Sequence, residues 1–212
     1  MDEHPRRYLA VIGDLVDSKK ISDRAGLQEK LHQGFSMLSN QPSVVSPFTI
    51  TLGDEFQAVF GSGEGLFASL FATRQLLYPV KCRFSIGIGT LSTEINAEQA
   101  IGMDGPAFHN AREGITELKA EKTLLTIKGL SRSMRALIDP LIKILWASTE
   151  NWKANRLEVL EGLIDGQTER ALANRLDLSE RAIYKNIKDG QLREWIGLIH
   201  EVEMRMTKVL DT

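Results

Sequence analysis

The chain has 212 residues and a formal net charge of -2, with 42% apolar and 25% charged residues. This length favours one core of about 130 residues plus a smaller module, and the composition excludes a disordered chain. The near-neutral charge excludes an overall basic protein but permits a local basic face. The single cysteine and the short apolar runs predict a cytoplasmic protein with no signal peptide and no membrane partner.

The first 130 residues alternate between strand and helix patterns. In chain order they predict a strand over 7–14, a helix after the caps Ser22 and Asp23, two strands joined at Gly53 and Asp54, a helix over 64–78 and a strand over 81–91. A further helix over 105–120 and a last strand over 122–129 follow, and from residue 131 onward the pattern is helical.

The first six of these elements have the order β-α-β-β-α-β. This order is typical of a ferredoxin-like sheet, in which the first two strands are parallel and the third lies between them, antiparallel to both. The fold class is therefore predicted as α+β, with a βαββαβ sheet, helices on one face and an all-α domain after it. We place the domains at residues 1–145 and 146–212.

An acidic turn interrupts the two strands of the hairpin. In the predicted topology, Asp14 and Asp17 at the end of the first strand lie at the same sheet edge as Asp54 and Glu55. Carboxylates gathered at one point repel each other, so they need a cation or a raised pKa. All-oxygen ligands suit Mg²⁺ or Mn²⁺. The alternative is structural: aspartates commonly cap helices and occupy turns.

The residues around this turn resemble known families. The stretches TLGDEFQAVF and FSIGIGT resemble the palm domains of GGDEF-type diguanylate cyclases and class III nucleotidyl cyclases, and AVIGDLVDSKKI stands where their first metal-binding strand would. Together with GPAFHNARE, the N-terminal segment is similar to the SatD family.

The resemblance implies roles for particular residues. It makes Asp14 and Asp54 the metal ligands, with the Leu15 carbonyl as a backbone ligand. It places a nucleotide or its phosphates at one set of residues: Asp17, Lys19, Lys20 and Glu55. Arg112 matches the arginine that stabilises charge on the triphosphate during transfer.

Several positions depart from the cyclase pattern or have a structural alternative. Ile50 and Phe108 stand where adenylyl cyclases place a base-selecting lysine and a ribose-binding asparagine. Lys19 and Lys20 would otherwise be a solvated pair. Arg112 would otherwise pair locally, for instance with Glu113 or Glu117, and His109 would carry protons only if it faced the cleft.

Residues 168–190 predict two helices joined by a short turn. Leu172 and Leu176 supply an apolar face, Asp177 lies in the turn, and Ser179 is a good cap for the second helix. The spacing resembles the helix-turn-helix of LuxR-type regulators, in which a small residue, here Ala173, lets the helices approach.

That resemblance makes the second helix a DNA reader, with one set of exposed residues in contact with DNA: Arg181, Tyr184, Lys185 and Lys188. The alternative is a helical hairpin that binds protein. The last helix carries an apolar stripe from Trp195 to Leu210, which would pack on the C-terminal core or pair two copies as a homodimer.

Three functions stay open from the sequence. The first is a transcriptional regulator with a metal- and nucleotide-binding sensor domain and a DNA-binding helix-turn-helix. The second is a metal-dependent nucleotidyl or phosphoryl transferase that uses Asp14, Asp54 and Arg112. The third is a protein-interaction scaffold with a degenerate acidic site.

Overall fold

The computed structural model describes residues 5–51 and 53–211. Leu52 lies outside the described residues, and so do residues 1–4, which begin the N-terminal segment predicted not to be a signal peptide. Five strands form one mixed sheet: β1 (Arg7–Leu15), β2 (Val44–Ile50), β3 (Glu55–Phe60), β4 (Cys82–Thr90) and β5 (Leu125–Lys128). Their order is β2-β3-β1-β4-β5. Strand β3 is antiparallel to both β1 and β2, as predicted, whereas β4 and β5 pair in parallel.

The helices agree with the predicted order of elements. They are α1 (Arg24–Leu38), α2 (Leu66–Leu77), α3 (Pro106–Glu121), α4 (Arg132–Ser148), α5 (Ala154–Ile164), α6 (Glu169–Arg175), α7 (Glu180–Gly190) and α8 (Leu192–Leu210), with a short 3-10 helix, η1 (Ser18–Lys20), after β1. The Asp23 carboxylate caps α1 by accepting a hydrogen bond from the Gly26 amide at 2.8 Å. In the described residues, none of the helices has both the length and the apolarity needed to span a bilayer.

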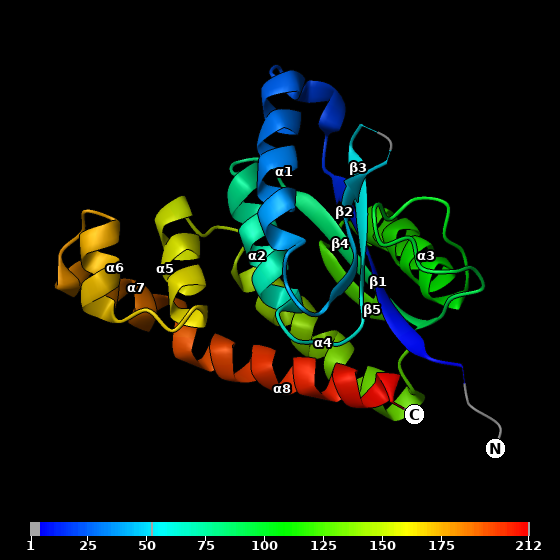
Figure 1. Ribbon diagram of the computed structural model, residues 1–212. Helices are drawn as coiled ribbons and strands as arrows, with labels where there is room; N and C mark the ends of the chain where they lie inside the picture. The colour runs from blue at the N-terminus through cyan, green and yellow to red at the C-terminus, as the bar shows by residue number, and fades with distance from the viewer. Residues whose placement is uncertain (1–4, 52, 212) are drawn as a thin grey trace.

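The sheet is covered on both faces, so the prediction of helices on one face is wrong for α3. Figure 1 shows α3 on one side of the sheet, with α1 and α2 on the other. Residues of β1 alternate between the two cores: Leu9 and Val11 pack towards α1 and α2, whereas Ala10 and Ile12 pack towards α3. Gly87 in β4 permits this close approach, because a Cβ there would lie 2.0 Å from the Ala107 carbonyl oxygen.

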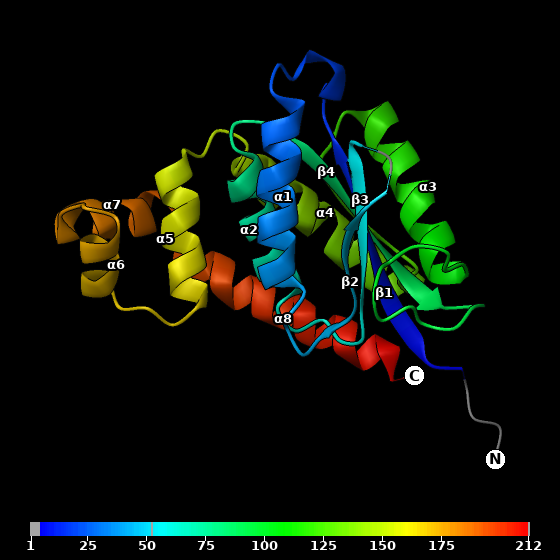
Figure 2. The same cartoon turned by 45° about the horizontal axis from the view of Figure 1, so that its top comes forward.

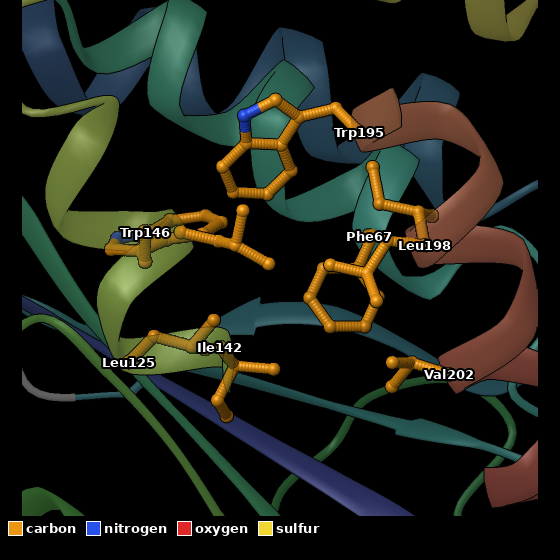
Figure 3. Close-up of a pocket in the computed structure, with 9 residues that line it drawn as sticks. Phe67, Leu125, Ile142, Trp146, Trp195, Leu198 and Val202 are labelled. Carbon is orange, nitrogen blue, oxygen red and sulfur yellow. The ribbon is translucent and has the colours of Figure 1, made fainter. Parts of the chain in front are cut away.

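Helices α4 and α8 join the same hydrophobic core as the sheet. The Trp195 ring on α8 packs edge-on against Phe71 on α2, with ring centroids 5.6 Å apart, and Trp146 on α4 also packs against Phe71, at 5.0 Å. Figure 3 shows these tryptophans around a small apolar cavity of about 10 Å³. The stripe on α8 therefore packs on the sheet domain. The division at residues 145 and 146 stays a prediction.

Hydrogen bonds at the start of α2 also fasten α8 to the sheet domain. The Glu203 carboxylate accepts from the Phe67 amide at 2.8 Å, and the Thr207 hydroxyl accepts from the Gly63 amide at 2.9 Å. Burial raises the pKa of the Glu203 carboxyl to about 7, although the amides of Phe67 and Gly65 lower it and Glu64 raises it further. Helix α8 is thus held by a carboxyl group that titrates near neutral pH.

This raised pKa predicts a pH-dependent stability. The folded-state pKa of Glu203 lies above its ordinary value of 4.5. The stabilisation that the protonated Glu203 carboxyl provides is therefore fully present below pH 4.5 and is lost as the pH rises through about 7. The loss amounts to about 3 kcal/mol. We expect Glu203→Gln, which stays neutral and keeps an acceptor oxygen, to be more stable than the wild type at about pH 8 but not at about pH 5, as measured by urea unfolding.

Glu201→Gln is the matched control on the same helix, because Glu201 pairs with Arg205 at the surface. This variant should keep the pH dependence of the wild type. An equal difference in unfolding free energy between Glu203→Gln and wild type at both pH values would contradict the assignment.

Candidate functional site

The end of β1 carries a charge cluster, which we define as Asp14, Glu55, Arg83, Arg112 and Lys119. The Asp14 carboxylate is only 8% exposed and contacts two cations: its Oδ1 lies 2.6 Å from Lys119 Nζ, and its Oδ2 lies 3.0 Å from Arg83 Nη1. Three elements meet here, because Asp14 is on β1, Arg83 on β4 and Lys119 on α3. The cluster faces α3 because Asp14 follows Ala10 and Ile12 in the strand alternation.

Glu55 and Arg112 complete the charge cluster. Glu55 begins β3 and lies directly opposite Asp14 in the strand register. Its Oε1 lies 3.5 Å from Arg112 Nη1, and the Arg112 side chain is 57% exposed. Glu113 and Glu117 instead bind Lys128, so the expected local pairing of Arg112 is not the one formed. Arg112 therefore reaches across from α3 towards the strand ends.

The remaining predicted residues lie beside this cluster. The Asp54 carbonyl accepts from the Leu15 amide at 2.9 Å, so the hairpin turn lies against the end of β1 as predicted. The Asp54 carboxylate accepts a 2.6 Å hydrogen bond from the Ser18 hydroxyl. Asp17 pairs with Lys20 at 2.9 Å, and the hydrogen bond from Lys20 lowers the Asp17 pKa.

The predicted phosphate-binding lysines differ in their surroundings. Lys20 is engaged by Asp17, whereas Lys19, in the middle of η1, is exposed. Neither lysine forms an ion pair with a member of the charge cluster in the described ranges. The turn and β1 are thus brought together, and the phosphate-binding role of Lys19 and Lys20 stays a prediction.

The side chains present do not fit a metal ion held by Asp14 and Asp54. Each carboxylate oxygen of Asp14 already contacts a protein cation, and Asp54 accepts from Ser18. Throughout residues 5–51 and 53–211, no group of three or more histidine, cysteine, aspartate or glutamate side chains is arranged to hold a metal. Arg83 and Lys119 supply the positive charge that crowded carboxylates require. Mg²⁺ or Mn²⁺ stays a prediction from the resemblance.

Sequence reasoning missed Arg83 and Lys119. Lys119 follows Arg112 by seven residues, a spacing that places two side chains on one face of a helix. Arg83 is the one charged residue between Cys82 and Thr90 in the printed sequence. Both signals were present, but only the packing of α3 on the sheet shows that these residues meet Asp14.

Other predicted or compared positions have structural roles. Phe108 is 2% exposed and packs between α3 and the sheet, and Ile50 is a partly buried member of the opposite core. His109 Nε2 lies 2.8 Å from Asp104 Oδ1, and both side chains are 65% exposed. His109 therefore faces solvent beside Asp104 and lies outside the charge cluster.

A second candidate site is the outer surface of α6 and α7. These helices lie at the end of the molecule away from α3 (Figures 1 and 2). Ser179 caps α7 by accepting from the Ala182 amide at 3.2 Å, as predicted. Asp177 adopts a left-handed conformation with φ of 50°, which is the backbone shape that a turn glycine usually provides. Ala173 is 5% exposed, and Leu172 beside it is fully buried.

Helix α7 is sharply divided between a buried and an exposed face. Ile183 and Ile187 are buried, while the residues predicted to contact DNA are all exposed: Arg181, Tyr184, Lys185 and Lys188. Tyr184 is 54% exposed. Within the part of the chain that the structure describes, no ion pair engages the three basic residues of this set. The surface therefore offers three cations and an aromatic ring to a partner.

A protein-family model matches most of the chain. The model of the SatD family matches residues 8–198. The chain belongs to the SatD family. A comparison with curated proteins gave no match. Both the charge cluster and the exposed face of α7 lie inside the range that matches the SatD model, so both belong to the family region of the chain.

Proposed function

We propose that this SatD-family chain is a DNA-binding regulator in which α6 and α7 form a helix-turn-helix. The observation that carries the proposal is the exposed face of α7, with its three cations unpaired in the described residues. A recognition helix presents such residues to the major groove, where lysine and arginine contact phosphates or guanine edges. The left-handed turn at Asp177 and the small buried Ala173 support the same motif.

Removal of the three cations should weaken DNA binding. We expect the triple variant Arg181→Gln, Lys185→Gln, Lys188→Gln to bind a random-sequence duplex of about 30 base pairs at least about 30-fold more weakly at low salt, because phosphate contacts dominate non-specific affinity. The slope of log affinity against log salt should fall by about one for each cation that no longer binds a phosphate. Fluorescence anisotropy of labelled DNA measures both quantities.

A variant with the same change in charge tests whether α7 itself is responsible. Lys122→Gln, Arg132→Gln, Lys208→Gln removes three cations from other elements. This control should keep its DNA affinity within about threefold of wild type, because it loses the same net charge as the first triple variant but keeps the three cations of α7. Equal decreases in affinity in the two triple variants, or no DNA binding by the wild type, would exclude α7 as the DNA-binding surface.

For the sheet domain we propose binding of a nucleotide through its phosphates. The strand order β4-β1-β3-β2 within the five-stranded sheet supports a ferredoxin-like palm and hence the predicted relationship to cyclases. The charge cluster holds three cations against two carboxylates, so it carries a net positive charge. Arg112 and Lys119 are each at least half exposed and can reach a phosphate. The ligand would act as the signal for the regulator.

Nucleotide binding should raise thermal stability. At a hundredfold excess over Kd, we expect a matching nucleoside triphosphate to raise Tm by about 5 °C. The rise should be absent in Lys119→Gln and kept in Lys122→Gln, which removes an exposed lysine three residues away. A panel of nucleoside triphosphates, each with and without Mg²⁺, is measured by differential scanning fluorimetry.

The same panel separates the competing functions. A rise that requires Mg²⁺ and disappears in Asp54→Asn would favour the transferase. No rise with any nucleotide would leave the sheet domain without a ligand and favour the scaffold. DNA binding by α7 is tested independently of both results.

A further inference from the structure

A groove outside both sites runs between α1, α2 and α5. These three helices lie in a row in Figures 1 and 2, with α2 between and behind the other two. We call this space the helical groove. It has a volume of about 540 Å³, which falls within the range of small-molecule sites. Its lining comes from both the sheet domain and the C-terminal helices.

The floor and one wall of the helical groove are apolar. Gly34 and Leu38 on α1 and Leu76 on α2 line this part of the groove, and the Leu76 side chain lies against Gly34. At the rim, Met37 is 69% exposed and Tyr78 is 47% exposed. Large apolar side chains around a concave surface favour an apolar ligand, because such a ligand removes their surface from water.

The opposite wall is acidic. Glu158 and Glu161 lie one helical turn apart on α5 and both line the groove. The nearest cation of Glu161 is Arg175, at 3.9 Å, and in the described ranges no ion pair engages the Glu158 carboxylate. Lys30 is the one basic residue in the lining. Arg175, which is outside the lining, offsets part of the charge of Glu161, so the negative charge of this wall that no ion pair in the described ranges balances is that of Glu158.

Burial disfavours this charge further. Desolvation raises the pKa of the Glu161 carboxyl; Arg175 lowers it, and Asp165 and Glu158 raise it again. A cation bound beside Glu158 and Glu161 would offset both the repulsion between them and the loss of water. The wall therefore suits a positively charged group, whereas the floor suits a hydrocarbon.

We propose that the helical groove binds a small organic amine, with its ammonium group at Glu158 and Glu161 and its apolar body over Leu76. An amine of this kind satisfies the acidic wall and the apolar floor together. Helix α5, which bears the two glutamates, packs against α2 on one side and against α7 on the other. The bound amine lies one helix away from the proposed DNA reader, which makes it a candidate effector.

A matched trio of probes tests the charge requirement. Isothermal titration calorimetry with 4-phenylbutylamine, 4-phenylbutanol and 4-phenylbutanoate holds the hydrocarbon nearly constant while the head group changes. We expect the amine to bind at least about tenfold more tightly than the alcohol, and the acid to bind most weakly. Binding is measured without DNA, so its failure is distinguishable from a failure of DNA binding.

Variants then place the binding in the helical groove. The double variant Glu158→Gln, Glu161→Gln should bind the amine no better than the alcohol. Ala72→Leu should block all three probes, because Ala72 on α2 also lines the groove and a larger side chain there fills it. Circular dichroism verifies that each variant is folded. The control Glu94→Gln, Glu98→Gln removes two exposed carboxylates elsewhere and should bind as wild type does.

Four results would overturn the proposal: no binding of the amine by wild type, equal binding of all three probes, unchanged amine binding in the double variant, or a groove closed by self-association. The last would show in light scattering as a dimer that Ala72→Leu disrupts. Tight amine binding that only the groove variants abolish would establish the site.

Discussion

Asp14→Ala is expected to destabilise the chain by about 3–5 kcal/mol, because it leaves a cation without its partner in a mostly buried place. Arg83 is only 16% exposed and lies 3.0 Å from the Asp14 carboxylate. Lys119 is half exposed, so water compensates for most of the effect on its side. Urea unfolding followed by circular dichroism measures the change.

Asp17→Ala is the matched control for this prediction. Asp17 also pairs with a cation, Lys20 at 2.9 Å, but both side chains are well exposed. Its removal should cost much less than the removal of Asp14, because water screens an exposed pair. A double variant, Asp14→Leu with Arg83→Met, should recover most of the stability, since apolar residues replace the whole pair.

An equally mild loss of stability in Asp14→Ala and Asp17→Ala would contradict the prediction. The Asp14 carboxylate would then contribute little to folding, and its burial between two cations would favour a role in ligand binding. A large effect recovered by the double variant would show that the charge pair mainly stabilises the end of β1.

Trp195→Ala is expected to cost about 3–5 kcal/mol and to preserve a single unfolding transition. The Trp195 ring is 5% exposed and packs against Phe71 on α2 and Trp152, which precedes α5. Because this ring joins the sheet domain to the C-terminal helices, its removal should lower the stability of both. Circular dichroism follows the helices, and the fluorescence of the other tryptophans follows the core.

Ile144→Ala on α4 is the control, because this side chain is 71% exposed and should contribute less than about 0.5 kcal/mol. Two separate transitions in Trp195→Ala, with only one shifted from wild type, would contradict a shared core. They would instead favour independent domains near the predicted boundary at residues 145 and 146.

The two modules are therefore connected through packing as well as through the chain. Glu203 and Thr207 on α8 hold the start of α2 and the loop before it, and the helical groove lies where α5 meets α1 and α2. Coupling between a ligand and DNA affinity would require the ligand to stabilise one arrangement of these elements over another. Equal DNA affinity with and without nucleotide or amine would exclude such coupling.

Local patterns in the sequence determined the kinds and order of the elements. The apolar run before Asp14 predicted β1, and Gly53 with Asp54 predicted the hairpin between β2 and β3. Ser179 and the spacing of Ile183 and Ile187 predicted α7 and its exposed basic face. These features depend on capping, turn geometry and side-chain periodicity, which act over a few residues.

Only the tertiary structure decided which groups neutralise each other and which surfaces are covered. Helix α3 packs on the far face of the sheet, so that Lys119 meets Asp14, and α8 buries Trp195 against the sheet domain. These interactions join residues far apart in the chain, and their geometry depends on how whole elements pack. The spacing of residues along one segment contains no information about the partner that another segment brings to it.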